Sequence, residues 1–181
     1  MSESVVSTDR SAVERLREAT LLSIHRHGFG QTTVTTVTEL AGLSRGMVRH
    51  EFGSKQQMVV AAMAHLCDTW LGMTEPDPSL PGPDQVRSIV RAMFAPAAFN
   101  AVNVDAWIAL SVEAAGDVEL RDVRSRTQRQ WIEQLTAAYD ASGVSHAANA
   151  AEATLAAADG LWLQQRLEEG PLDSQAVTAT A

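Results

Sequence analysis

A short stretch near the N-terminus concentrates side chains that bind anions. Within eleven residues it carries two arginines, one histidine and the only lysine of the 181-residue chain: Arg45, Arg49, His50 and Lys55. Guanidinium and ammonium groups form hydrogen bonds with phosphate oxygens, and arginine also pairs with the edge of guanine. The types and spacing of these residues make a nucleic acid a candidate partner.

The charge of the chain is divided unevenly. The formal net charge is −8, which by itself disfavours a polyanionic partner. Residues 1–56 nevertheless hold seven Lys/Arg and six Asp/Glu, whereas residues 57–181 hold seven and sixteen. Almost all of the acidity therefore lies outside the N-terminal part, and the net charge does not exclude a nucleic-acid partner for that part.

The spacing of apolar residues is helical over nearly the whole sequence. These residues recur at three- and four-residue intervals, without a convincing run of strand-like alternation. The segment EPDPSLPGPD holds four of the six prolines and must interrupt the helices. The predicted fold class is all-α, with eight or nine helices. The expected helices cover about 13–27, 33–41, 45–51, 55–73, 86–95, 103–115, 117–142 and 146–169.

Residues 33–51 have the layout of a helix-turn-helix. Two short helices are joined through Gly42, and Ser44 is placed to cap the second. Val48 and Phe52 are four residues apart, so both can anchor that helix on a core while its polar residues project outward. A recognition helix that enters the major groove has this layout. Spacing alone leaves a second interpretation open, a solvated surface with scattered arginines.

The run TTVTTVTELAGLSRGMVRHEFGSKQQM, residues 32–58, resembles the N-terminal signature of the TetR family of bacterial transcriptional repressors. A Thr-Thr-Val start, an Ala-Gly-x-Ser turn, a glycine in the next helix, a phenylalanine and a Ser-Lys pair occur in the family's order. The resemblance implies that four residues contact bases: Arg45, Gly46, Met47 and His50. It implies that three others contact phosphates: Thr33, Arg49 and Lys55.

Two positions depart from the family's pattern. Arg49 replaces a common aromatic residue and should keep or strengthen a phosphate contact. Glu51 stands where an aromatic residue or a histidine is frequent, and a carboxylate near phosphates is unfavourable unless it is paired. Lys55 lies four residues on and can pair with Glu51, or Glu51 can accept a hydrogen bond from cytosine N4. Both interpretations stay open at this stage.

The second part of the sequence resembles a ligand-binding and dimerisation domain. The segments DAWIALSVEAAGDVELRDV and AADGLWLQQRLEEGPLD are similar to the C-terminal domain of the choline-responsive repressors of betaine synthesis. The two resemblances together imply a three-helix DNA-binding domain over residues 9–58 and a helical ligand-binding and dimerisation domain over residues 59–181.

Aromatic and acidic residues of the second domain are candidates for an effector site. Tryptophan faces together with a carboxylate suit a cationic or hydrophobic small molecule. Core packing, an interhelical salt bridge and simple exposure are the competing interpretations. The candidate ligand-binding residues are Trp70, Trp107, Glu113, Asp159 and Trp162.

The last predicted helix contains many small residues, with seven alanines between Ala147 and Ala157. Small side chains let helices approach closely, and a helix that is apolar on several faces needs cover on several sides. The pattern favours a homodimer that supplies this cover from a second copy. Burial of the helix inside one subunit is the alternative.

Other classes of protein are not indicated by the sequence. It contains no His-Glu-x-x-His, no Gly-x-Ser-x-Gly and no phosphate-binding glycine loop, so we predict neither an enzyme nor a metal or cofactor site. The single cysteine, Cys67, cannot form an internal disulfide. Apolar runs are shorter than the roughly 20 residues of a membrane span. We expect a cytoplasmic protein that does not contact membranes.

These observations lead to one functional hypothesis and one alternative. The first is a ligand-responsive repressor that binds a palindromic DNA operator as a homodimer and is released by a small-molecule effector. The alternative is a helical binding or scaffold protein of the same fold that no longer reads DNA, an interpretation that Glu51 and the net negative charge favour.

Overall fold

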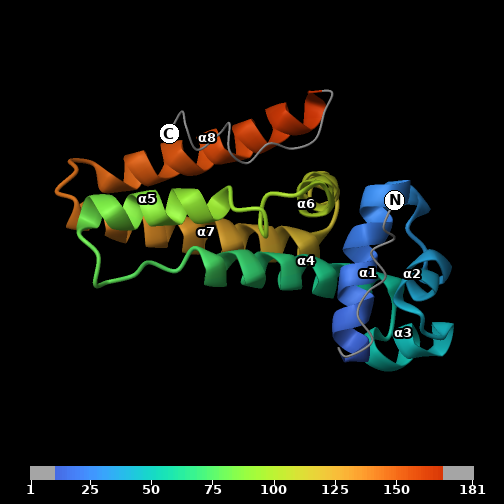
Figure 1. Ribbon diagram of the computed structural model, residues 1–181. Helices are drawn as coiled ribbons and strands as arrows, with labels where there is room; N and C mark the ends of the chain where they lie inside the picture. The colour runs from blue at the N-terminus through green and yellow to red at the C-terminus, as the bar shows by residue number, and fades with distance from the viewer. Residues whose placement is uncertain (1–10, 169–181) are drawn as a thin grey trace. The chain divides into compact units, whose positions relative to one another are not determined.

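The computed structural model describes residues 11–168, and within this range every regular element is a helix (Figure 1). This confirms the predicted all-α class. Among these helices none combines the length and the apolar character needed to cross a bilayer. The helices are α1 Ala12–His27, α2 Val34–Ala41, α3 Arg45–Phe52, α4 Lys55–Met73, α5 Gly82–Met93, α6 Ala101–Glu113, α7 Val118–Ala141 and α8 Ala147–Leu167, with a 3-10 turn at Phe29–Gln31.

The helices form two compact units. Of the described residues, the first unit contains those up to Leu66 together with Asp105–Val123, and the second contains Cys67–Val104 together with those from Arg124 onward. The unit boundaries fall inside α4, α6 and α7, so these three helices each contribute residues to both units. These units are defined by packing alone. The boundary between a DNA-binding domain that ends at residue 58 and a ligand-binding domain that begins at residue 59 stays a prediction.

Side-chain hydrogen bonds cap the starts of α1, α2 and α4, whereas Ser44, the N-cap of α3, makes no such bond. Ser11 begins α1 with a capping box, in which its hydroxyl accepts from the Glu14 backbone N–H and the Glu14 side chain accepts from the Ser11 N–H. Ser54 accepts from the Gln57 N–H at 3.1 Å at the start of α4. The start of α8 differs from the expected cap at Ser145. The N-cap is His146, held in the left-handed region at φ 61°, so Ser145 lies one residue outside the capping position.

The interior of the second unit is an aromatic cluster. Trp70 and Trp131 stack with ring centroids 5.8 Å apart, and Trp162 lies 4.8 Å from Trp70 and 6.3 Å from Trp131. All three side chains are at most 2% exposed. The indole N–H of Trp131 donates to Thr74 Oγ1 at 3.0 Å, and that hydroxyl donates to the Trp70 carbonyl. The cluster therefore satisfies a polar group while it packs α4, α7 and α8 of this unit together.

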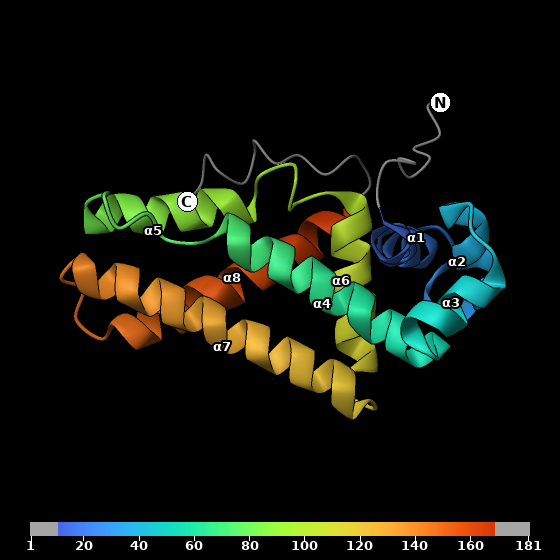
Figure 2. The same ribbon diagram turned by 90° about the horizontal axis from the view of Figure 1, so that it is seen from below.

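In the second unit, the start of α5 lies close to the end of α7. In Figure 2, α7 and α8 run back along each other from a short turn. The Tyr139 hydroxyl on α7 lies 2.6 Å from the Thr154 hydroxyl on α8. At the start of α5, a Cβ on Gly82 would overlap the backbone of Ala141 and Ser142. Only glycine allows α5 to begin this close to the end of α7.

The thiol of Cys67 is buried in the second unit, where it is 1% exposed. Burial raises the pKa of the thiol to about 11, and a hydrogen bond with Thr127 opposes that effect only in part. A buried thiol with a raised pKa is a poor nucleophile at neutral pH, so we expect the folded protein to react slowly with thiol reagents.

The same pKa predicts how stability depends on pH. Between about pH 9 and 11 the folded state keeps the Cys67 proton that the unfolded state releases, so the free energy of unfolding should fall as the pH rises. The expected contribution is about 2 kcal/mol across this window. Urea unfolding of the wild type and of Cys67→Ala at several pH values measures it. A wild type whose pH dependence matches that of Cys67→Ala would contradict the assignment.

Candidate nucleic-acid interface

The helix-turn-helix of the first unit is held by its own backbone and by α1. Gly42 ends α2 in the left-handed region at φ 63°, and the next N–H, of Leu43, donates to the Thr38 carbonyl at 2.9 Å. The guanidinium of Arg15 on α1 donates to the Ala41 carbonyl at 2.5 Å. The turn between α2 and α3 is therefore fixed from both sides, which sets the direction of α3.

The core beneath α3 determines which of its residues face outward. Val48 is 2% exposed and packs in a cluster formed by α1, α2, α3 and α4, and Phe52 lies against the same cluster. Arg45, Arg49 and His50 are left in solvent. The exposed residues of α3 are Arg45, Gly46, Arg49 and His50. The expectation that Val48 and Phe52 anchor this helix is confirmed.

Met47 is less exposed than the other three residues that are predicted to contact bases. Its side chain is half-buried and packs against the core cluster instead of projecting freely from α3. The reason is geometric, since Met47 is adjacent to Val48 at the inner edge of the helix. A base contact by Met47 stays a prediction from the family resemblance.

Thr33 and Lys55 stand at the starts of the helices that flank α3. Thr33 is the exposed N-cap of α2, where its hydroxyl accepts from the Thr36 N–H at 3.2 Å. Lys55 is the exposed first residue of α4, and its Nζ lies 5.6 Å from the ring centroid of Phe29. Both helix starts present backbone N–H groups of the kind that bind phosphate.

The carboxylate of Glu51 has a neighbour on its own helix. Its Oε1 lies 3.0 Å from Nδ1 of His50, whereas the Lys55 ammonium lies over Phe29. The pairing of Glu51 with Lys55 that the four-residue spacing allows is therefore not the arrangement seen in the structure.

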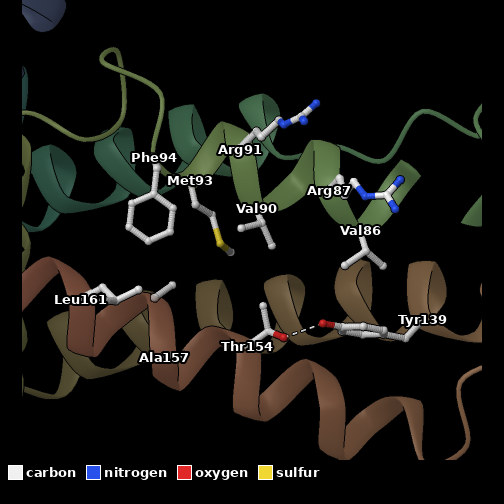
Figure 3. A pocket seen from close by; sticks show the side chains of 11 residues that line it. Val86, Arg87, Val90, Arg91, Met93, Phe94, Tyr139, Thr154, Ala157 and Leu161 are labelled. Atoms are coloured by element: carbon white, nitrogen blue, oxygen red, sulfur yellow. Dashed lines mark hydrogen bonds between the residues drawn. The ribbon is translucent and has the colours of Figure 1, made fainter. Parts of the chain in front are cut away.

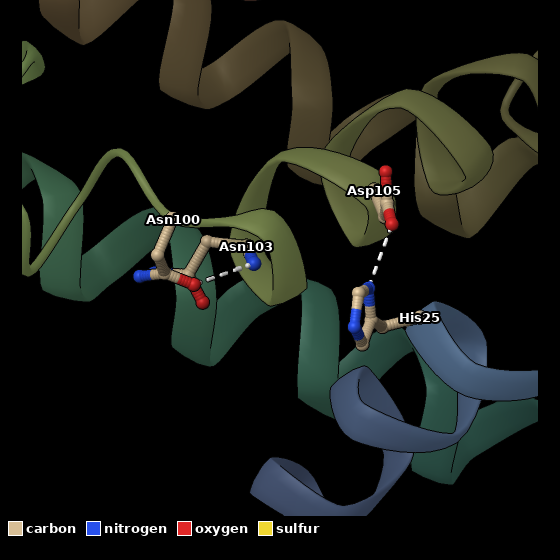
Figure 4. A network of polar contacts seen from close by, with 4 residues as sticks. All are labelled: His25, Asn100, Asn103 and Asp105. Atoms are coloured by element: carbon tan, nitrogen blue, oxygen red, sulfur yellow. Dashed lines mark hydrogen bonds and ion pairs between the residues drawn. The ribbon is translucent and has the colours of Figure 1, made fainter. Parts of the chain in front are cut away.

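Polar contacts between residues far apart in the sequence join helices of the first unit. Gln57 Nε2 donates to both carboxylate oxygens of Glu119, at 2.8 and 3.0 Å, and Gln56 donates to Asp117. On α1, His25 Nδ1 lies 2.7 Å from Asp105 Oδ2 on α6 (Figure 4). The residues next to Lys55 are thus fixed by the start of α7, and the end of α1 by α6.

The five candidate effector residues fall into different units. Trp107 is buried and Glu113 is exposed in the first unit. Trp70 and Trp162 belong to the aromatic cluster of the second unit, and Asp159 is half-buried on α8. The structure brings Trp70 and Trp162 into contact with each other. The assignment of all five to an effector site stays a prediction.

Several residues that support the interface were missed by sequence reasoning. Arg15, Phe29, Gln56 and Gln57 act through partners between 26 and 62 residues away along the chain. The one local feature that could have indicated a supporting role is the position of Gln56 and Gln57, which follow Lys55 directly. A long-range partner cannot be read from helical periodicity.

These elements define a class of protein. An exposed, basic second helix held on a three-helix core by a tight turn is a helix-turn-helix DNA-binding domain, here part of a larger helical regulator. Residues 16–62 match the bacterial regulatory proteins of the tetR family, and residues 83–181 match the C-terminal domain of BetI-type transcriptional repressors. The chain belongs to the TetR family, a family of transcriptional regulators without enzymatic activity, and carries a BetI-type C-terminal domain.

Individual relatives agree with this assignment. The chain is 32% identical to the HTH-type transcriptional regulator BetI of Burkholderia ambifaria, over 92% of this chain and 88% of the relative. A transcriptional regulator from Rhodococcus sp. Rha1 has a similar structure, with 25% identity, a TM-score of 0.76 and coverage of 86% and 84%. A putative transcriptional regulator from Saccharomonospora viridis, solved in complex with choline, shares the fold at 16% identity, a TM-score of 0.77 and coverage of 93% and 92%.

Proposed function

We propose that this chain is a repressor that binds a palindromic DNA operator as a homodimer and leaves it when a small molecule binds. The exposure of Arg45, Arg49 and Lys55 on a rigidly held helix-turn-helix carries the proposal. In this scheme Arg45, Gly46, Met47 and His50 meet bases in the major groove. Thr33, Arg49 and Lys55 hold phosphates, which sets the register of the helix on the duplex.

The surface of α8 supports the homodimer. Its buried residues and most of its exposed apolar residues follow two separate stripes at three- and four-residue spacing, on opposite faces of the helix. The buried stripe is Ala147, Ala151, Leu155, Ala158 and Trp162. The exposed stripe is Ala153, Ala156, Gly160, Leu163 and Leu167. We call the second set the α8 stripe.

A second copy is the occupant that the α8 stripe favours. It contains no charged residue, and its leucines Leu163 and Leu167 are 45% and 77% exposed. Small residues in its first half allow another helix to approach closely, and leucines in its second half supply apolar area. A palindromic operator requires two recognition helices about 34–36 Å apart, and a two-fold symmetric pair of chains presents them in that way.

An effector is the third part of the proposal. The choline-bound regulator from Saccharomonospora viridis shares the fold, which supports a small organic molecule as the signal. To release DNA, that molecule must bind the DNA-incompetent state more tightly. A hundredfold release corresponds to roughly 2.7 kcal/mol of coupling, within the usual range for allosteric proteins.

The contribution of Lys55 provides the first test. Lys55→Ala should weaken operator binding roughly tenfold, by a similar factor for every sequence, and reduce the salt dependence of log K by about one. Titrations of the DNA that flanks the protein's own gene, at several salt concentrations, measure both quantities. Arg129→Ala, which removes an exposed charge from α7, is the matched control and should change neither.

Two outcomes would contradict this assignment. A Lys55→Ala protein that prefers a different operator sequence but keeps the wild-type salt dependence would place Lys55 at a base. A wild type that binds no flanking DNA at low salt would favour the alternative, a helical scaffold protein of the same fold without DNA recognition.

A further inference from the structure

The second unit contains a pocket that the predicted effector residues do not line. Its volume is about 440 Å³, and it lies among residues of α5, α7 and α8 (Figure 3). Pockets that bind small organic molecules in proteins have volumes of roughly 300–1,000 Å³. Every lining residue belongs to the same compact unit.

Most of the wall is aliphatic. Val86, Val90 and Met93 of α5 point toward α8 in Figure 3, where Leu161 faces them. Leu161 is 37% exposed, so an apolar ligand that covers it removes hydrocarbon surface from water. The walls suit an unbranched or lightly branched apolar body.

A pair of hydroxyl groups lies at one end of the pocket. The oxygens of Tyr139 and Thr154 are 2.6 Å apart, and both residues line the space. Two hydroxyl groups carry two protons, and their mutual hydrogen bond uses one of them. Whichever oxygen donates in that bond, the pair keeps a second O–H that can donate to a ligand oxygen.

The charged residues at the pocket are of one sign. Arg87 and Arg91 line it, and no aspartate or glutamate does. Arg87 is paired with Asp84 at 2.5 Å, so its charge is partly offset, whereas Arg91 is exposed on the next turn of α5. A cationic ligand would be repelled here and would find no carboxylate to balance it. In Figure 3 the Arg91 side chain extends away from α8, so its guanidinium would have to turn over the rim of the pocket to meet an anionic ligand.

We propose that this pocket is the effector site and that its effector is an amphipathic anion, an apolar body that carries a carboxylate. The apolar body lies between α5 and α8, and the carboxylate meets Arg91 at the rim. The inference rests on the proposed function for its regulatory meaning, and it names an anionic effector where the sequence predicted a cationic or hydrophobic one. It differs in this respect from the choline bound by the regulator of Saccharomonospora viridis.

Three probes of equal chain length test the class of ligand. Decanoate, 1-decanol and decyltrimethylammonium share an apolar body and differ in the charge of the head group. Calorimetric titration of the full chain, without DNA, should give the tightest binding for decanoate and the weakest for decyltrimethylammonium. A tighter complex with decyltrimethylammonium than with decanoate would overturn the proposal.

Variants locate the site. Arg91→Gln should weaken decanoate binding about threefold to tenfold and leave 1-decanol unchanged, because it removes only the charge-assisted contact. Leu161→Trp should weaken both probes by filling the pocket. Arg129→Gln removes an exposed arginine of α7 outside the pocket and should change neither. Unchanged decanoate affinity in both Arg91→Gln and Leu161→Trp would exclude this pocket as the site.

Operator release is measured separately. Because decanoate binding is read without DNA, a protein that binds no operator contradicts the proposed function and leaves the ligand result intact. Decanoate should lower the operator affinity of the wild type and lower that of Arg91→Gln only at higher concentration. Binding of decanoate that leaves operator affinity unchanged would overturn the effector role of the pocket.

Discussion

Replacing Ala156 with glutamate is expected to leave the protein monomeric and to weaken its binding to a palindromic operator by about 10²–10⁴-fold. Ala156 lies in the first half of the α8 stripe, among its small residues, and is exposed in the single chain. In a two-fold symmetric interface each substitution occurs on both copies, so two carboxylates would be buried in the interface without partners. A monomer can occupy one half-site only and loses the gain from linked binding.

Folding of this variant should be retained. Alanine and glutamate are both good helix formers, and the side chain at position 156 points away from the buried face of α8. Sedimentation velocity at micromolar concentration gives the oligomeric state, and an operator titration gives the affinity. Ala148→Glu changes an exposed alanine of the same helix outside the stripe and should remain dimeric. A wild type that sediments as a monomer, or a dimeric Ala156→Glu, would contradict the proposed interface.

The second large effect is expected in the aromatic cluster. Trp131→Ala should lower the free energy of unfolding by about 3–5 kcal/mol, because it removes a side chain that is 1% exposed and leaves a cavity beside Trp70 and Trp162. It also removes the N–H that donates to Thr74. Total stabilities are commonly about 5–15 kcal/mol, so the variant should unfold at a much lower urea concentration.

Two further variants separate packing from the hydrogen bond. Trp131→Phe keeps most of the apolar volume and loses the donor, so it should cost less than the alanine variant. Val112→Ala removes apolar atoms from a side chain that is 67% exposed and should be nearly neutral. A loss below about 1 kcal/mol for Trp131→Ala would show that the cluster can collapse onto the space, in which case these tryptophans could also rearrange around a ligand.

Features of this fold that depend on residues close together in the sequence could be predicted, whereas contacts between distant residues could not. Helical spacing, the glycine at position 42 and the prolines between α4 and α5 act within a few residues, and the sequence by itself determined the helices and the helix-turn-helix from them. The anchoring of α3 through Val48 follows from the same periodicity. Some helix starts were displaced. α5 begins at Gly82 and α6 at Ala101, before the expected positions of about 86 and 103. The N-cap of α8 is His146, which takes a left-handed conformation that residue type does not predict.

Only the tertiary structure decided which side chains meet across the chain. The hydrogen bonds of Gln57 with Glu119 and of Arg15 with Ala41 join helices that are far apart in sequence. The same holds for the pocket, because its walls come from three helices and its volume depends on their separation. Tryptophan faces together with a carboxylate predicted a cationic or hydrophobic effector, whereas the residues that line the pocket include arginines and hydroxyl groups. Composition records which groups a chain contains, but the electrostatics of a site depend on which of them the packed helices bring to one place.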